Sequence, residues 1–134
     1  GSKGIMILTQ ANPYFEAGWP ARRRGSLGIA PPNAKRPSGH VEFVNALARE
    51  VLAYDKPVAY VHGDTHYFRV DKPLIVDNKK GGNRGTVLEH FTRVELFGYP
   101  EAHWVRATVD PDSAHVFSFT PEMVRENYND HGKK

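Results

Sequence analysis

Apolar and polar positions in the first half of the chain predict a strand, a helix and a second strand. Residues 5–9 form a short apolar run between polar residues, which is typical of a buried strand. Over residues 39–54 apolar side chains recur every three or four positions, which predicts an amphipathic helix capped by Ser38. Residues 58–61 are again apolar and predict a second buried strand. The expected apolar stripe of the helix is Phe43, Leu47, Val51 and Tyr54.

This order of elements favours two parallel neighbouring strands with the helix packed on one face of their sheet. Between the first strand and the helix, residues 13–38 show no periodicity and contain five prolines and three glycines. A connection of this length inside a domain is uncommon and is often a functional lid. We therefore expect a long loop at this place.

The second half of the chain predicts antiparallel strands. Strands are expected at residues 67–70, 73–76, 89–97, 103–109 and 116–119, with a glycine-rich loop at 78–85. The turn signals at residues 98–102 predict a hairpin between the strands at 89–97 and 103–109. The fold class expected is therefore α/β, as strand–helix–strand followed by antiparallel strands, over residues 4–126.

Composition narrows the function classes. The chain has 134 residues and no cysteine, which excludes disulfides, thiolate zinc sites and cysteine nucleophiles. No apolar run is long enough to span a bilayer. Residues 1–3 are typical of an expression scar with its flank, and residues 127–134 of a polar tail.

The net charge of +3 leaves two interpretations open. Its clearest cluster, the arginines at 22–24, lies among glycine and proline, which favours a solvated loop or an anion-attracting rim. The alternative is a basic β-rich domain that binds nucleic acid, and charge is its only support.

The strongest candidate for chemistry is the segment 62–66, which reads HGDTH. It follows the second buried strand, and ligands in α/β sheets gather outside the carboxyl ends of strands. Two imidazoles and one carboxylate so close together can converge on a metal ion. The alternative is a turn in which Asp64 caps backbone N–H groups while the histidines are merely polar.

A second candidate is the segment 10–13, which reads QANP and follows the first buried strand. If the two strands are parallel neighbours, both segments open on the same edge of the sheet. Amide oxygens can bind hard cations. Asn-Pro is also a common start of an ordinary turn, so this segment alone indicates little.

Residues 62–69 resemble the Gly-His-X-His motif of calcineurin-like metallophosphoesterases. Gly63, Thr65 and His66 match that motif, whereas Asp64 stands where the family has its first histidine. The strand ending near Asn12 is similar to the family's strand that ends in a His-X-Pro loop. The resemblance covers roughly residues 4–120 and implies the C-terminal half of a four-layer α/β/β/α sandwich.

By this resemblance the parent protein hydrolyses a small-molecule phosphate ester with two divalent metal ions, which are Mn, Fe or Zn. The implied ligands are His66, Asp64 and Asn12. Candidates for a second shell or for substrate contact are His62, Arg69, Gln10 and Arg23. The family's upstream motifs, Asp-X-His, Gly-Asp-X-X-Asp and Gly-Asn-His-Asp/Glu, are absent from this sequence. We therefore expect the fragment itself to be inactive, to hold no metal tightly and to self-associate through an uncovered apolar sheet face.

One further hypothesis keeps the fold without the chemistry. The carboxylate at Asp64 and the absence of histidine from segment 10–13 are compatible with a degenerate phosphoesterase that acts as a binding module. The number of metal ions bound by the parent distinguishes this hypothesis from the enzymatic one.

Overall fold

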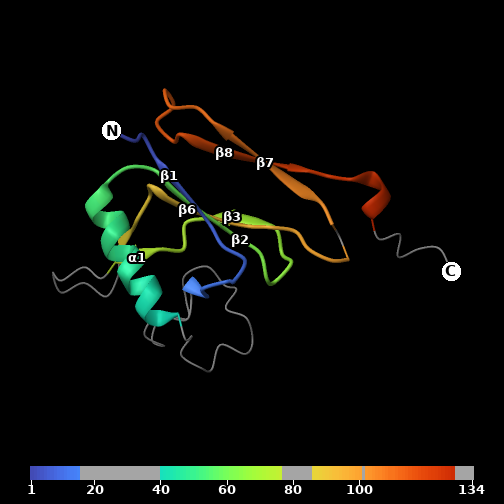
Figure 1. The fold of residues 1–134 in the computed structure, drawn as a ribbon, viewed down its shortest axis with the longest axis horizontal. Coiled ribbons are helices and arrows are strands. Elements are labelled where there is room, and N and C mark those ends of the chain that lie inside the picture. Colours follow the sequence, from blue (N-terminus) through green and yellow to red (C-terminus); the bar gives the residue numbers. More distant parts are fainter. Residues whose placement is uncertain (16–39, 77–85, 101, 129–134) are drawn as a thin grey trace. The chain divides into compact units, whose positions relative to one another are not determined.

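The structure, a computed structural model, describes residues 1–15, 40–76, 86–100 and 102–128 (Figure 1). The chain divides into two compact units. One comprises Gly1–Asn12, Lys56–Lys72 and Glu89–Lys134, and the other comprises Pro13–Asp55 and Pro73–Leu88. The described part is a mixed α/β protein dominated by strands, with one α-helix. The coarse α/β class is therefore confirmed.

A four-stranded sheet forms the centre of the first unit. Its strands are β1 (Ile5–Leu8), β2 (Val58–His62), β6 (Phe91–Glu95) and β3 (Arg69–Asp71), in the order β1-β2-β6-β3. Strands β1, β2 and β6 are parallel, and β3 is antiparallel to β6. The predicted parallel pairing of the first two strands is confirmed. Every residue of β2 is buried, as expected of a central strand that is rich in valine.

Strand β1 is not the buried strand that its apolar sequence predicts. Within the described sheet it pairs only with β2, and its residues are exposed or half-buried. Leu8 is 71% exposed. A run of apolar residues predicts an extended strand but cannot distinguish a central strand from an edge strand, because the difference lies in which neighbours are present.

The predicted hairpin between residues 89–97 and 103–109 is wrong. Both edges of β6 are occupied, by β2 on one side and β3 on the other. Strand β7 (Trp104–Val109) instead pairs with β8 (Phe117–Glu122) in a separate antiparallel ribbon. A short 3₁₀ helix, η2 (Arg125–Asn127), follows this ribbon. The turn signals at 98–102 mark the departure of the chain from the sheet, not a return to it.

The second unit contains the helix α1 (Val41–Tyr54) and a small ribbon of β4 (Ile75–Val76) and β5 (Thr86–Val87). The helix ends at Asp55, which adopts a left-handed conformation with φ 50° while its N–H donates to the Val51 carbonyl. Most of the predicted loop at 13–38, from residue 16 onward, lies outside the described residues, as do the predicted loop at 78–85 and the proposed cap Ser38. At its N-terminus, the helix has His40 as the N-cap residue without a side-chain cap bond.

The buried stripe of α1 consists of Val44, Leu47 and Val51. Leu47 and Val51 are as predicted, but Phe43 is 42% exposed and Val44 takes its place. Both choices satisfy helical spacing, so periodicity alone could not separate them.

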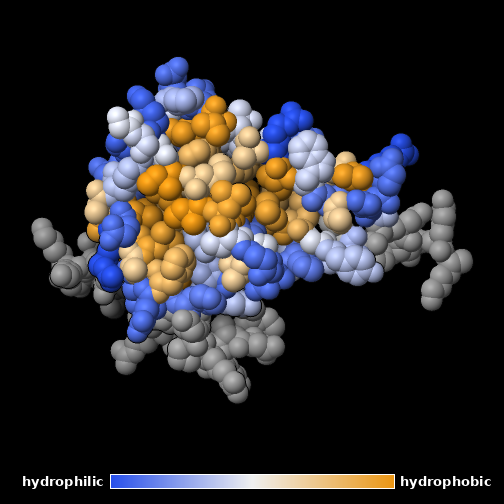
Figure 2. Space-filling view, viewed as in Figure 1, coloured by the Kyte–Doolittle hydropathy of each residue, from blue (hydrophilic) through white to orange (hydrophobic). Residues whose placement is uncertain are grey.

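No helix among the described residues is long and apolar enough to cross a membrane. Apolar side chains are exposed on the face of the protein shown in Figure 2. In the first unit, Leu8 and Val70 are exposed at the two outer strands of the sheet.

Phe91 provides a direct test of the role of β6 as an inner strand of the sheet. It is fully buried, so Phe91→Ala is expected to lower the free energy of unfolding by about 3–5 kcal/mol. The exposed Leu8 is the control, because Leu8→Ala should change stability by no more than about 0.5 kcal/mol. Urea denaturation of both variants measures the difference, and equal losses would contradict the assignment of the core.

Candidate functional site

The carboxyl ends of β1 and β2 lie side by side. The N–H of Thr9 donates to the Val61 carbonyl over 2.9 Å, and beyond the strands the N–H of Gly63 donates to the Gln10 carbonyl over 3.1 Å. The segments 10–13 and 62–66 therefore start from the same edge of the sheet, as predicted. This edge is the one formed by the carboxyl ends of the strands. Strand β6 ends at the same edge, because Leu96 donates its N–H to the His62 carbonyl over 2.8 Å.

His66 is exposed on the connection between β2 and β3, with φ 60°. Its Nδ1 lies 2.8 Å from the Tyr99 carbonyl oxygen. A carbonyl oxygen can only accept, so Nδ1 carries the proton and Nε2 carries the lone pair of the neutral ring. Metal-binding histidines typically donate their second ring N–H to a backbone carbonyl or a carboxylate in this way. With Nδ1 engaged in this way, the neutral His66 ring would bind a metal ion through Nε2.

Asp64 and Asn12 differ in their surroundings. Asp64 is exposed, with φ 85°, a positive value that aspartate adopts more readily than most residues. Asn12 is buried. Gln10 is exposed, and its contribution to the edge is the backbone carbonyl that accepts from Gly63. Arg23 lies outside the described residues.

Among the described residues, no three or more His, Cys, Asp or Glu side chains converge as a metal site would require. One imidazole, one carboxylate and one amide suit a divalent cation in chemical type. They are too few for two complete coordination shells, so any dinuclear centre needs ligands from other residues.

His62 is an interior residue, not a surface ligand. Its side chain is fully buried, and its Nδ1 donates to the Gly63 carbonyl over 2.9 Å. Burial lowers the pKa of His62 below its ordinary value. The bond to Gly63 and the charge of Glu95 act in the opposite direction, whereas Arg93 and Arg69 add to the lowering. The neutral ring is therefore favoured.

Glu95 is the residue of this edge that sequence reasoning missed. It is fully buried at the end of β6, in register with His62 on one side and Arg69 on the other. Arg69 Nε donates to Glu95 Oε2 over 2.6 Å, so the guanidinium that was a candidate for substrate contact is engaged by this carboxylate. Glu95 Oε1 is buried and accepts no hydrogen bond from the described residues.

A second ion pair lies one step along the same face of the sheet. Arg93 is buried and donates to both carboxylate oxygens of Asp71, with Nε to Oδ1 at 2.7 Å. Arg93 and Glu95 are two positions apart on β6, as are Arg69 and Asp71 on β3, so both pairs share one face. The available signal in the sequence was the run Arg-Val-Glu at 93–95, in which two charged residues flank an apolar one.

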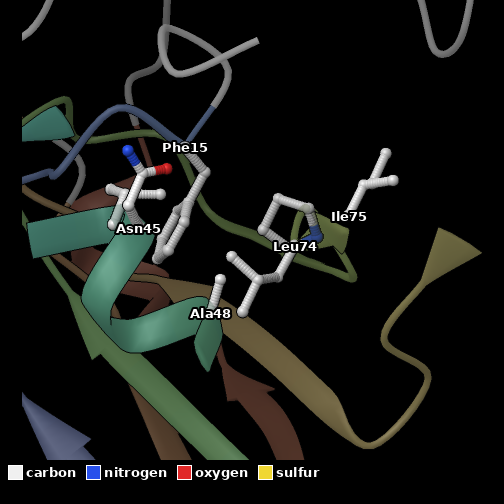
Figure 3. A pocket seen from close by; sticks show the side chains of 7 residues that line it. Phe15, Asn45, Ala48, Leu74 and Ile75 are labelled. Carbon is white, nitrogen blue, oxygen red and sulfur yellow. The ribbon is translucent and has the colours of Figure 1, made fainter. Parts of the chain in front are cut away.

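A small hollow in the second unit offers no comparable chemistry (Figure 3). It is lined by Phe15, Val44, Asn45, Ala48, Pro73, Leu74 and Ile75. Asn45 is the one polar side chain of this lining, and the ionisable groups described above all belong to the first unit.

Comparison with known proteins gives no relative: no protein-family model, no curated protein and no solved structure matches the chain.

The buried and exposed ion pairs are expected to differ in strength. Arg69→Met leaves Glu95 buried without its partner and should destabilise by about 3 kcal/mol. Arg106→Met, which removes the exposed 2.7 Å pair with Glu122, should cost less than about 1 kcal/mol. The double variant Arg69→Met/Glu95→Gln should recover part of the loss, since the unpaired buried charge of Glu95 is removed as well. Urea denaturation measures all three, and comparable losses for the two single variants would be inconsistent with a buried pair.

Stability should decrease in mild acid because of His62. Its pKa is lower in the folded than in the unfolded chain, so the unfolded state takes up the proton first as the pH falls below about 6.5. The loss from this group is at most about 1.4 kcal/mol per pH unit. The measurement is the free energy of unfolding at pH 7.5 and 5.5, in buffer that contains a chelator. It should depend less on pH in His62→Gln than in the wild type. The same dependence in both would exclude His62 as its source.

Proposed function

We propose that this chain supplies one side of the metal centre of a metallophosphoesterase, as the C-terminal part of a four-layer α/β/β/α sandwich. The observation that carries the proposal is the position of His66 and its hydrogen bond. This residue follows the central strand β2, shares an edge with the segment after β1, and donates its Nδ1 proton to Tyr99. The resemblance of residues 62–69 to the family motif is the reason for proposing this chemistry.

His66 and Asp64 are the proposed metal ligands, with Asn12 as a third donor. Manganese, iron and zinc all accept this mixture of imidazole and oxygen donors. Divalent metals, when bound, neutralise phosphate oxygens and generate a nucleophile from water. The substrate class proposed is a small-molecule phosphate ester.

The protein's own contribution is to hold these donors at fixed places. The register of β1 with β2 and the bond from Gly63 to Gln10 bring the segments of Asn12 and Asp64 to one edge. The ion pair of Glu95 and Arg69 joins β6 to β3, and β3 is the strand that follows the connection carrying His66. This arrangement provides the preorganisation that a metal site requires.

The remaining ligands are proposed to come from an upstream part of the parent protein. An apolar row of the sheet favours such a partner half. In this row Leu8, Val61, Val94 and Val70 are neighbours in register on β1, β2, β6 and β3. The two inner residues are buried, whereas Leu8 and Val70 at the ends are exposed. Further packing there would cover them, and the isolated chain could self-associate through the same surface.

The test is hydrolysis by the longer protein that this proposal implies. Loaded with manganese, it should hydrolyse para-nitrophenyl phosphate or bis-para-nitrophenyl phosphate, and His66→Ala should reduce the rate at least about 100-fold because a ligand is lost. His115→Ala is the matched control, since His115 is exposed beyond β7 and should leave the rate unchanged.

Three outcomes are informative. Two metal ions per chain with metal-dependent turnover would support the enzyme. Metal-free protein without turnover would support the degenerate binding module instead. Turnover that is equal in His66→Ala and the wild type would contradict the assigned site.

A further inference from the structure

We infer that Gly98 and the Tyr99 carbonyl are positioning elements for His66, which together hold its ring in place and fix its tautomer. The inference rests on the proposed function, in which His66 is a metal ligand through Nε2. Gly98 and Tyr99 belong to a third segment of the chain. This segment lies outside residues 10–13 and 62–69, which carry the resemblance.

Gly98 leaves the space that the imidazole ring fills. A Cβ atom built on Gly98 would lie 2.2 Å from Cδ2, 2.4 Å from Cγ and 2.7 Å from Nε2 of His66. These distances are far below any van der Waals contact, so the ring packs directly against the glycine backbone. Any side chain at position 98 would have to displace the His66 ring.

The Tyr99 carbonyl fixes the orientation of the same ring. It accepts the Nδ1 proton over 2.8 Å, so rotation of the ring about its Cβ–Cγ bond would break this bond. In the neutral ring the lone pair is then confined to Nε2. Packing against Gly98 and bonding to Tyr99 thus act on one side chain from consecutive residues.

The fold explains why this segment reaches His66. Strand β6 runs parallel to β2, and the Leu96 N–H extends the pairing past the strand end to the His62 carbonyl. Residues 96–99 therefore leave the sheet at the edge from which residues 63–66 also leave. His66 and Gly98 are in contact because their two segments leave the sheet at the same place.

A general packing role for Gly98 is the competing interpretation. Gly4 provides a control that distinguishes a packing role from a positioning role. A Cβ at Gly4 would also be too close to its neighbours, at 2.9 Å from both the Phe117 ring and the Pro57 carbonyl oxygen. Gly4→Ala should therefore strain the same unit without touching His66. Neither glycine has the positive φ that would penalise alanine by itself.

The experiment measures the tautomer of His66 and the metal affinity of the protein. Imidazole ¹⁵N NMR of the metal-free protein, with His66 assigned from the His66→Gln variant, should show protonated Nδ1 and unprotonated Nε2. Gly98→Ala should abolish this pattern and weaken Zn²⁺ binding about 10- to 100-fold, as loss of an outer-shell partner typically does. Gly4→Ala should lower thermal stability while leaving both readouts unchanged.

Two results would overturn the inference. One is a wild-type His66 protonated at Nε2, and the other is a Gly98→Ala variant whose His66 signals and Zn²⁺ affinity equal those of the wild type. Failure of the proposed function alone would look different. The tautomer would then depend on Gly98 as expected, but His66→Gln would bind Zn²⁺ as well as the wild type.

Discussion

The hydrogen bond from the Gly63 N–H to the Gln10 carbonyl is the contact on which the candidate site depends. It extends the parallel pairing of β1 and β2 by one step beyond their ends, into the two segments that carry the proposed ligands. Without parallel register, these segments would leave the sheet at opposite ends. A Cβ on Gly63 would lie 3.6 Å from the Gln10 oxygen, so the two backbones meet at ordinary contact distance.

Two ion pairs, each with one buried partner, join β6 to β3. Two arginines and two carboxylates, on β6 and β3, pair across one face of the sheet, and Glu95 also lies in register with His62. Buried ion pairs add little net stability compared with apolar packing, but removing one partner is costly. Such pairs therefore specify which strand lies beside which. Here they join β3 to β6, and with it the end of the connection that carries His66.

The sequence predicted the local elements well and their partners less well. Periodicity located the helix and the two parallel strands, since these depend on residues close together in the chain. It could not show that β6 lies between β2 and β3, because that pairing is set by Arg69, Asp71, Arg93 and Glu95 across more than twenty residues. For the same reason Glu95 was missed and Arg69 was assigned to substrate. The segment 62–66 was recognisable because a turn after an apolar strand is a local signal, whereas the role of Gly98 requires coordinates.

The central claim is that the segments of Asn12 and of Asp64 and His66 line one metal centre. Titration of the ¹⁵N-labelled protein with substoichiometric Mn²⁺ tests it directly, since a bound paramagnetic ion broadens the amide signals nearest to it. The account predicts that broadening begins at residues 10–12, 63–66 and 98–99 together, while β7 and β8 are spared. Broadening that is uniform, or that begins at His115 while residues 63–66 stay sharp, would contradict it.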